Sequence, residues 1–346
     1  MQTLWFWLVA IMICGYVVFD GFDLGAGLLH LVLARTDAER RLVLKTIGPV
    51  WDGNEVWLLA AGGTLYFAFP GLYASGFSGF YLPLMMVLWL LVLRGISIEF
   101  RNHLEGPLWP PFWDVVFCLA SGLLALFLGV ALGNVVRGVP LNADGWFFEP
   151  LWTNFSTRGN TGILDWYTVI VGVAAVVSLA LHGALWVWLK TDGPVAERAR
   201  RLAHRAWPIV LVMIAAVTAV TWVVQPVVPE HLAARPWGYV LPALAIAGVG
   251  GVVRGIIADR PRTAFLSSAV YLVGMLASAA FGLYPYVLPS STDPAYGLTA
   301  QSVAAPLAGL QLGLVWWIPG MLIAAGYFVY VYRHFGGKAE VEGEGY

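Results

Sequence analysis

Charged residues are scarce in this chain of 346 residues. Asp, Glu, Lys and Arg together make up 11% of it, and its formal net charge is −1. Because a soluble domain carries about 25% charged residues, this composition excludes an ordinary soluble enzyme. The balanced charge gives no reason to expect a nucleic-acid partner. Hydrophobic residues make up 60% of the chain, which indicates a polytopic membrane protein.

The residues that build common redox and metal centres are also few. The two cysteines, Cys14 and Cys118, form no CxxC motif and lie in apolar surroundings, so we predict packing roles and no disulfide. His30 and His182 fall within apolar runs, but no CxxCH motif and no clear pair on facing helices accompanies them. We therefore predict polar packing residues, with no metal site and no haem ligand in this chain. The N-terminus lacks a basic region and a cleavage site, which predicts a retained first helix.

Long apolar runs predict an all-α polytopic membrane protein with about nine spans, because a spanning helix needs about 20 apolar residues. The loop lengths permit two four-helix bundles plus one peripheral helix. We assign residues 1–334 to a single integral-membrane domain and 335–346 to a short polar cytoplasmic tail. The predicted spans are Leu4–Leu33, Trp51–Phe69, Tyr73–Leu93, Trp113–Val135, Leu164–Leu189, Ala206–Val224, Trp237–Ile257, Phe265–Leu288 and Leu310–Tyr332.

The basic residues predict the orientation of these spans. With nine spans, 16 of the 19 Lys and Arg residues fall on one side, and only Arg137, Arg158 and Arg235 fall on the other. Since cytoplasmic loops carry the excess of Lys and Arg, the N-terminus is predicted outside and the C-terminus in the cytoplasm.

Four carboxylates interrupt the first two apolar runs. Asp20 and Asp23 lie in the first run, and Asp52 and Glu55 open the second, each pair at i, i+3 spacing on one helical face. A charge at the bilayer centre costs roughly 2.5–3.5 kcal/mol on insertion scales, so an intramembrane acid indicates function by default. The predicted orientation places all four in the cytoplasmic half, which favours a path for proton uptake.

A structural interpretation remains open for some acids. Glu55, Glu99 and Asp114 are placed where they could cap helices or pair with Arg35, Arg94 or Arg101 near the interface. Asp165 begins the fifth predicted span and is typical of an N-terminal cap.

Five segments in order resemble subunit II of the cytochrome bd quinol oxidase family. They are FDGFDLGAG (19–27), GPVWDGNEVWL (48–58), SGFSGFYLPLM (75–85), RGISIEFR (94–101) and YPYVLPSST (284–292). The DGFDxGxG and WDGNxVW elements form a specific pair, and the resemblance covers essentially the whole chain.

The resemblance implies a haem-free subunit of a terminal oxidase of the bacterial inner membrane, with no complete active site of its own. The complex would oxidise membrane quinol, reduce dioxygen to water with cytoplasmic protons and contribute to proton-motive force. Haems b and d would belong to the partner subunit I, and small single-helix accessory subunits could join. Some members hold a structural quinone, but the short connection at 225–236 weakens the expectation of a site there.

The family's residue roles are carried over to the matching positions. This subunit is expected to stabilise subunit I and to supply the proton path through Asp52, Asp20, Asp23 and Glu55. Trp51 is expected at the subunit interface, with structural support from the RGISIEFR residues Arg94, Glu99 and Arg101.

An independent proton-coupled transporter with a midplane carboxylate site is the alternative interpretation of the same acids. Purification of the tagged chain separates the two hypotheses. A second polypeptide with haem absorbance supports the oxidase, and a haem-free single chain that moves a solute supports the transporter.

Overall fold

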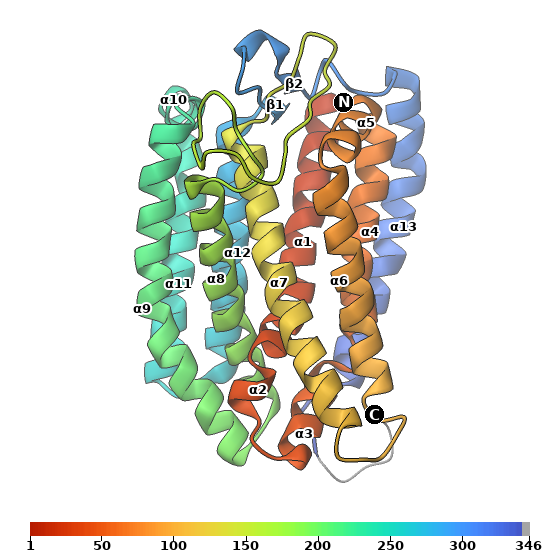
Figure 1. The fold of residues 1–346 in the computed structure, drawn as a ribbon, viewed down its shortest axis with the longest axis vertical. Coiled ribbons are helices and arrows are strands. Elements are labelled where there is room, and N and C mark those ends of the chain that lie inside the picture. The colour runs from red at the N-terminus through yellow and green to blue at the C-terminus, as the bar shows by residue number, and fades with distance from the viewer. Residues whose placement is uncertain (341–346) are drawn as a thin grey trace.

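The computed structural model describes residues 1–340 as a bundle of helices with one small hairpin at its end (Figure 1). In chain order the elements are α1 (Gln2–Leu28), α2 (His30–Leu33), α3 (Asp37–Ile47), α4 (Trp51–Ala68), α5 (Pro70–Gly79), α6 (Tyr81–Phe100), α7 (Trp109–Arg137), α8 (Trp166–Lys190), α9 (Gly193–Val224), α10 (Val227–Ala234), η1 (Pro236–Tyr239), α11 (Val240–Ile257), α12 (Pro261–Leu283), β1 (Tyr286–Leu288), η2 (Pro294–Tyr296), β2 (Leu298–Thr299) and α13 (Leu307–His334). Strands β1 and β2 pair antiparallel.

The long helices can be divided into two groups of four and one outer helix, a grouping that the loop lengths permit. One group contains α1, α4, α6 and α7, and the other contains α8, α9, α11 and α12. The two groups meet where α7 and α1 pack against α8 and where α1 packs against α12. Helix α13 lies beyond α4 at one edge of the bundle (Figure 1), and Leu310 is its one buried residue in the described part of the chain. The all-α architecture is therefore confirmed.

Eight helices within residues 1–340 are long and apolar enough to cross a membrane: α1, α6, α7, α8, α9, α11 with its preceding 3-10 turn, α12 and α13. Helix α4, also predicted as a span, is helical over 18 residues and runs beside α1. It is not among the eight, and its first turns contain Asp52, Asn54 and Glu55. A spanning α4 stays a prediction.

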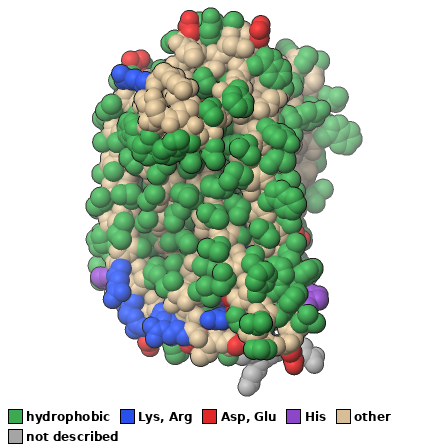
Figure 2. All heavy atoms as spheres, viewed as in Figure 1, with side chains coloured by type: hydrophobic (Ala, Val, Ile, Leu, Met, Phe, Trp, Pro, Cys, Tyr) green, Lys and Arg blue, Asp and Glu red, His purple; other side chains and the backbone are tan. Residues whose placement is uncertain are grey.

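Basic side chains gather at the end of the bundle that holds the C-terminal end of α13, while apolar side chains cover the middle of the visible face (Figure 2). The predicted orientation assigns this Lys- and Arg-rich end to the cytoplasm.

Glycines bring α1 and α8 into backbone contact beside the acids of α1. A Cβ atom on Gly25 would lie 2.0 Å from the Leu179 carbonyl oxygen, and one on Gly183 would lie 2.3 Å from the Gly25 carbonyl carbon. Small residues allow such close approach between membrane helices. This contact fixes the part of α1 that carries Asp20 and Asp23.

The first predicted span differs from the structure at its C-terminal end. Helix α1 ends at Leu28, and α2 and the amphipathic α3 follow before α4 begins. A capping box starts α3, since Thr36 accepts from the Glu39 N–H while the Glu39 side chain accepts from the Thr36 N–H. The T-x-x-E spacing was the signal for this short helix, which the predicted spans leave out.

Candidate functional site

Asp20 of α1 forms a buried ion pair with Arg94 of α6. Arg94 Nη1 donates to Asp20 Oδ2 at 2.8 Å, and Nη2 donates to Oδ1. Both side chains are 0% exposed. The planar guanidinium matches both carboxylate oxygens at once, so the pair joins α1 to α6 with fixed geometry.

Asp23 lies one turn further along α1 and is buried without an ion pair among the described residues. Its Oδ2 accepts a 2.7 Å hydrogen bond from Asn54 Nδ2 of α4, whereas its Oδ1 has no hydrogen-bond partner in the described part of the chain. The amide oxygen of Asn54 in turn accepts from the Tyr332 hydroxyl of α13 at 2.8 Å. Asn54 and Tyr332 are absent from the sequence-based site. A polar amide between Asp52 and Glu55 was a signal for Asn54, but nothing in the sequence indicates which helix neighbours α13.

Glu55 completes the group of acids around Arg94. Its Oε2 lies 3.8 Å from Arg94 Nη1, and its side chain is 24% exposed. We call Asp20, Asp23, Glu55 and Arg94 the acid cluster. It contains three carboxylates and one guanidinium, so it can hold exchangeable protons without leaving a positive charge uncompensated.

Asp52 lies outside this cluster. It is exposed on the first turn of α4, with no ion pair among residues 1–340. Its neighbour Trp51 is partly buried and packs over Gly95 of α6. The structure thus brings together three of the four predicted path residues and leaves Asp52 on the surface of the isolated chain.

A second buried network surrounds Asp114 near the N-terminal end of α7. Asp114 Oδ1 accepts from Arg101 Nε at 2.6 Å and lies 2.7 Å from His30 Nε2, while Oδ2 accepts from Arg40 Nη1 at 3.1 Å. This confirms the structural interpretation of Asp114 as an interface ion pair. Glu99, two residues before Arg101, is exposed and has no ion pair in the described chain.

Arg101 also ties α3 to this network. Its Nη2 donates to Asp37 Oδ1 at 2.7 Å, and Arg41 contacts the other Asp37 oxygen. Partial burial alone would raise the pKa of Asp37, but the hydrogen bond and charge of Arg101, helped by Arg41, lower it below its usual value. The hydrogen bond from Arg198 of α9 likewise lowers the pKa of Glu39. Ion pairs therefore hold α3 against the ends of α6 and α9.

At the opposite end, Asp165 caps α8 as predicted. Its Oδ1 accepts from the N–H groups of Tyr167 and Thr168 at 2.7 and 2.8 Å. Its Oδ2 also accepts from Arg137 of α7, which anchors the long outer loop to the bundle.

Three of the four ring nitrogens of the two histidines within apolar runs have hydrogen-bond partners, and the buried Nδ1 of His30 has none among the described residues. His182 Nδ1 lies 2.6 Å from Ser268 Oγ and Nε2 lies 3.0 Å from the Val18 carbonyl oxygen, so both nitrogens are used between α8, α12 and α1. His30 Nε2 is used by Asp114. Within residues 1–340, no group of three or more His, Cys, Asp and Glu could hold a metal ion.

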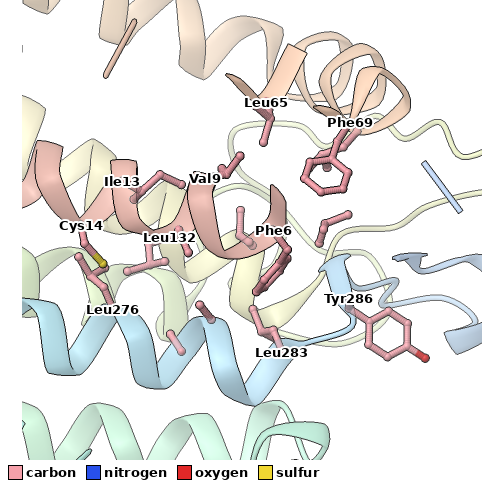
Figure 3. Close-up of a pocket in the computed structure, with 16 residues that line it drawn as sticks. Phe6, Val9, Ile13, Cys14, Leu65, Phe69, Leu132, Leu276, Leu283 and Tyr286 are labelled. Carbon is pink, nitrogen blue, oxygen red and sulfur yellow. The ribbon is translucent and has the colours of Figure 1, made fainter. Parts of the chain in front are cut away.

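An apolar cavity of about 150 Å³ lies between α1, α4, α7 and α12 toward the N-terminal end of α1 (Figure 3). Phe6, Phe69, Leu132 and Leu283 are among its lining residues, and the Tyr286 hydroxyl points away from it. A quinone head group needs hydrogen-bond donors for its carbonyl oxygens, and this lining offers only the Cys14 thiol. The cavity therefore fits a short apolar chain and not a quinone head.

Comparison with known proteins gives consistent matches over nearly the whole chain. Residues 1–335 match the family described as cytochrome bd terminal oxidase subunit II. The chain is 30% identical to the probable cytochrome oxidase subunit 2 of Haemophilus influenzae, over 98% of this chain and 95% of that protein. It is also 30% identical to the cytochrome bd-I ubiquinol oxidase subunit 2 of Escherichia coli K12, over 93% of this chain and 90% of that protein.

The fold matches a solved structure as well. The bd oxidase from Geobacillus thermodenitrificans contains a chain that aligns with a TM-score of 0.71 at 19% identity, covering 96% of this chain and 98% of that one. At this identity the likeness concerns the fold.

Proposed function

The chain belongs to the cytochrome bd terminal oxidase subunit II family, and from this premise we propose that it supplies the cytoplasmic proton path of a quinol oxidase. It is a multi-pass protein of the bacterial inner membrane and a subunit of an oxidoreductase complex. In the proposal, the complex oxidises membrane quinol and reduces dioxygen to water. Family membership favours this function over an independent transporter.

The acid cluster is the observation that carries the proposal. Asp20 and Asp23 are buried in α1, and Glu55 adds a third carboxylate against the one guanidinium of Arg94. Carboxylates in a low-dielectric site exchange protons with their surroundings when a hydrogen-bonded route exists. We propose that these side chains accept protons from the Lys- and Arg-rich end and pass them toward the partner subunit.

The haems b and d of the proposed partner subunit I would supply the electron transfer and oxygen reduction. His182 does not fit a haem ligand, because the protein uses both of its ring nitrogens. The Nε2 of His30 is taken by Asp114, and its Nδ1 is buried without a hydrogen-bond partner among the described residues. This chain's residues therefore hold and move protons, and the electron path lies outside it. No structural quinone is assigned to the apolar cavity, since its lining does not fit the head group.

The exposed face of α4 and α6 supports a second role, the stabilisation of subunit I. Asp52 is exposed on α4, and a charge facing lipid is costly. Large apolar side chains are also exposed on both helices: Leu59 of α4 is 73% exposed and Trp89 of α6 is 65% exposed. We propose that the partner covers this face, which brings Asp52 and Trp51 to the subunit interface and places Glu55 next to it.

The test uses Asp23→Asn, Asp20→Asn and Asp52→Asn in the complete complex, measured as quinol-driven oxygen consumption together with the haem spectrum. We expect each variant to keep its haem spectrum and to lose turnover. Asp144→Asn, in the exposed outer loop, is the matched control and should behave as the parent. Unchanged turnover in all three variants would exclude a proton path through these acids, and loss of haem would assign them a structural role instead.

A further inference from the structure

Only one of the two carboxylate oxygens of Asp23 has a hydrogen-bond partner among the described residues. A buried carboxylate has two acceptor oxygens, and Asp23 uses only Oδ2, toward Asn54. The charged groups nearest to it are Asp20 on its own helix, Glu55 of α4 and Arg94 of α6, and Arg94 is already bonded to Asp20. Because buried polar atoms without partners are rare and costly, the free Oδ1 marks a position where a proton can be added.

A hydrogen bond from Tyr332 fixes the orientation of the Asn54 side-chain amide relative to Asp23. The Tyr332 hydroxyl donates to Asn54 Oδ1 at 2.8 Å, and this leaves the Asn54 NH₂ group to donate to Asp23 at 2.7 Å. Without the Tyr332 hydroxyl, the amide could rotate and present its oxygen to the carboxylate. An amide neither takes up nor releases a proton near neutral pH, so Asn54 orients Asp23 and does not relay protons itself.

Tyr332 also borders a polar cavity at the Lys- and Arg-rich end. This cavity has a volume of about 230 Å³ and is lined in part by Thr46, Lys190, Tyr332 and His334. A space of this size with polar walls has room for several waters. Tyr332 therefore contacts both the cavity and the amide that holds Asp23.

We propose that this cavity is the proton entrance. Tyr332 and Asn54 are positioning residues that orient the Asp23 carboxylate, so that its Oδ1 stays without a hydrogen-bond partner and can receive the proton. An excess proton enters the cavity as a hydronium ion, whose O–H bond breaks to leave neutral water. Asp23 Oδ1 forms the new O–H bond, and the carboxylate becomes a neutral carboxyl group. Release of that proton toward Asp20 and Glu55 restores the carboxylate. The inference rests on the proposed proton path and adds its entrance.

The test compares Tyr332→Phe and Asn54→Leu with two tyrosine controls in the complete complex. Tyr271→Phe removes a buried hydroxyl that contacts Ser178 at 2.7 Å, between α12 and α8 and outside the acid cluster. Tyr330→Phe changes an exposed tyrosine of the same helix as Tyr332. Quinol-driven oxygen consumption is measured across the pH range in which the complex is stable, with the haem spectrum as the check on assembly.

We expect Tyr332→Phe to lower turnover about three- to tenfold, the range expected for one hydrogen bond, and to move the alkaline limb of the pH profile to higher pH. The limb moves because the donor that favours the charged form of Asp23 is no longer held in place. Asn54→Leu should have the larger effect, and the double variant should be no worse than Asn54→Leu alone, since both act through Asp23. Both tyrosine controls should keep the parent pH profile.

The inference is overturned if the pH profile of Tyr332→Phe matches the pH profile of Tyr271→Phe. This holds even if both variants have a lower turnover than the parent. If Asn54→Leu fails to assemble with haem, the pH profiles of Tyr332→Phe and Tyr271→Phe still test the inference. Inactive Asp23→Asn together with a normal Tyr332→Phe would remove this entrance and leave the proposed proton path standing. Full turnover in Asp23→Asn would also overturn this entrance, and full turnover in Asp20→Asn and Asp52→Asn as well would exclude the proton path itself.

Discussion

Neutralising one member of the Asp20–Arg94 pair should destabilise the complex more than neutralising both. In Asp20→Asn the Arg94 charge stays buried at 0% exposure without its bidentate partner. Breaking a buried pair in this way costs roughly 3–5 kcal/mol. Glu55 remains 3.8 Å from Arg94 Nη1 as a weaker partner, so we expect the lower end of that range, about 3 kcal/mol. Arg94→Met should cost more, because it leaves both Asp20 and Asp23 buried without a cation.

The double variant Asp20→Asn/Arg94→Met removes both charges and should recover part of the lost stability, with a coupling free energy of about 1–3 kcal/mol. The assay is the apparent melting temperature of the detergent-solubilised complex, followed by haem absorbance at one fixed scan rate. Arg41→Met is the control, because its pair with Asp37 is exposed and such pairs contribute about 0–1 kcal/mol. Additive losses in the double variant, or an Asp20→Asn melting temperature equal to that of Arg41→Met, would refute the reasoning.

Three further outcomes are expected. Gly183→Ala should reduce the amount of assembled complex seen on size-exclusion chromatography, because its Cβ would lie 2.3 Å from the Gly25 carbonyl carbon, whereas Gly250→Ala meets open space and should not. Asp114→Asn should lower the melting temperature by several degrees, as it leaves Arg101 and its neighbours without their shared anion. The lowered pKa of Asp37 means that its ion pairs stabilise α3 above the ordinary carboxylate range and are lost as pH falls through the folded value. Amide exchange in α3, corrected for intrinsic rates, should therefore rise below about pH 4, and a constant rate would contradict this.

Helix positions along the chain could be predicted because an apolar run of sufficient length has one stable form in a membrane. The run predicted as Leu164–Leu189 corresponds to α8 at Trp166–Lys190. Where a helix continues into water, hydropathy gives no boundary. Helix α9 begins at Gly193, 13 residues before the predicted span, because its first turns are polar but still helical.

The sequence indicated that the acids of α1 and α4 lie at one level of the bundle, and their partners could be predicted only in part. Helical spacing predicts Asp20 and Asp23 on one face, and the sequence offers Arg94 as a possible partner for acids near the interface. Which acid takes the arginine depends on how α1 rotates against α6. The roles of Asn54 and Tyr332 depend on α13 packing beside α4, which is a contact between residues 278 positions apart. Local periodicity carries no information on such a pairing.

The outer position of α13 has a consequence for biogenesis. A chain that enters the membrane from its N-terminus places Asp20, Asp23 and Asn54 long before residue 332 leaves the ribosome. Until then the Asn54 amide has no hydroxyl to orient it, and the surface of α1 and α4 that α13 will cover is open. Docking of the last helix, through Tyr332 at one end and the Trp5 indole bonded to the Leu310 carbonyl at the other, finishes the polar interior. The acid site is thus complete only after α13 has docked against α1 and α4.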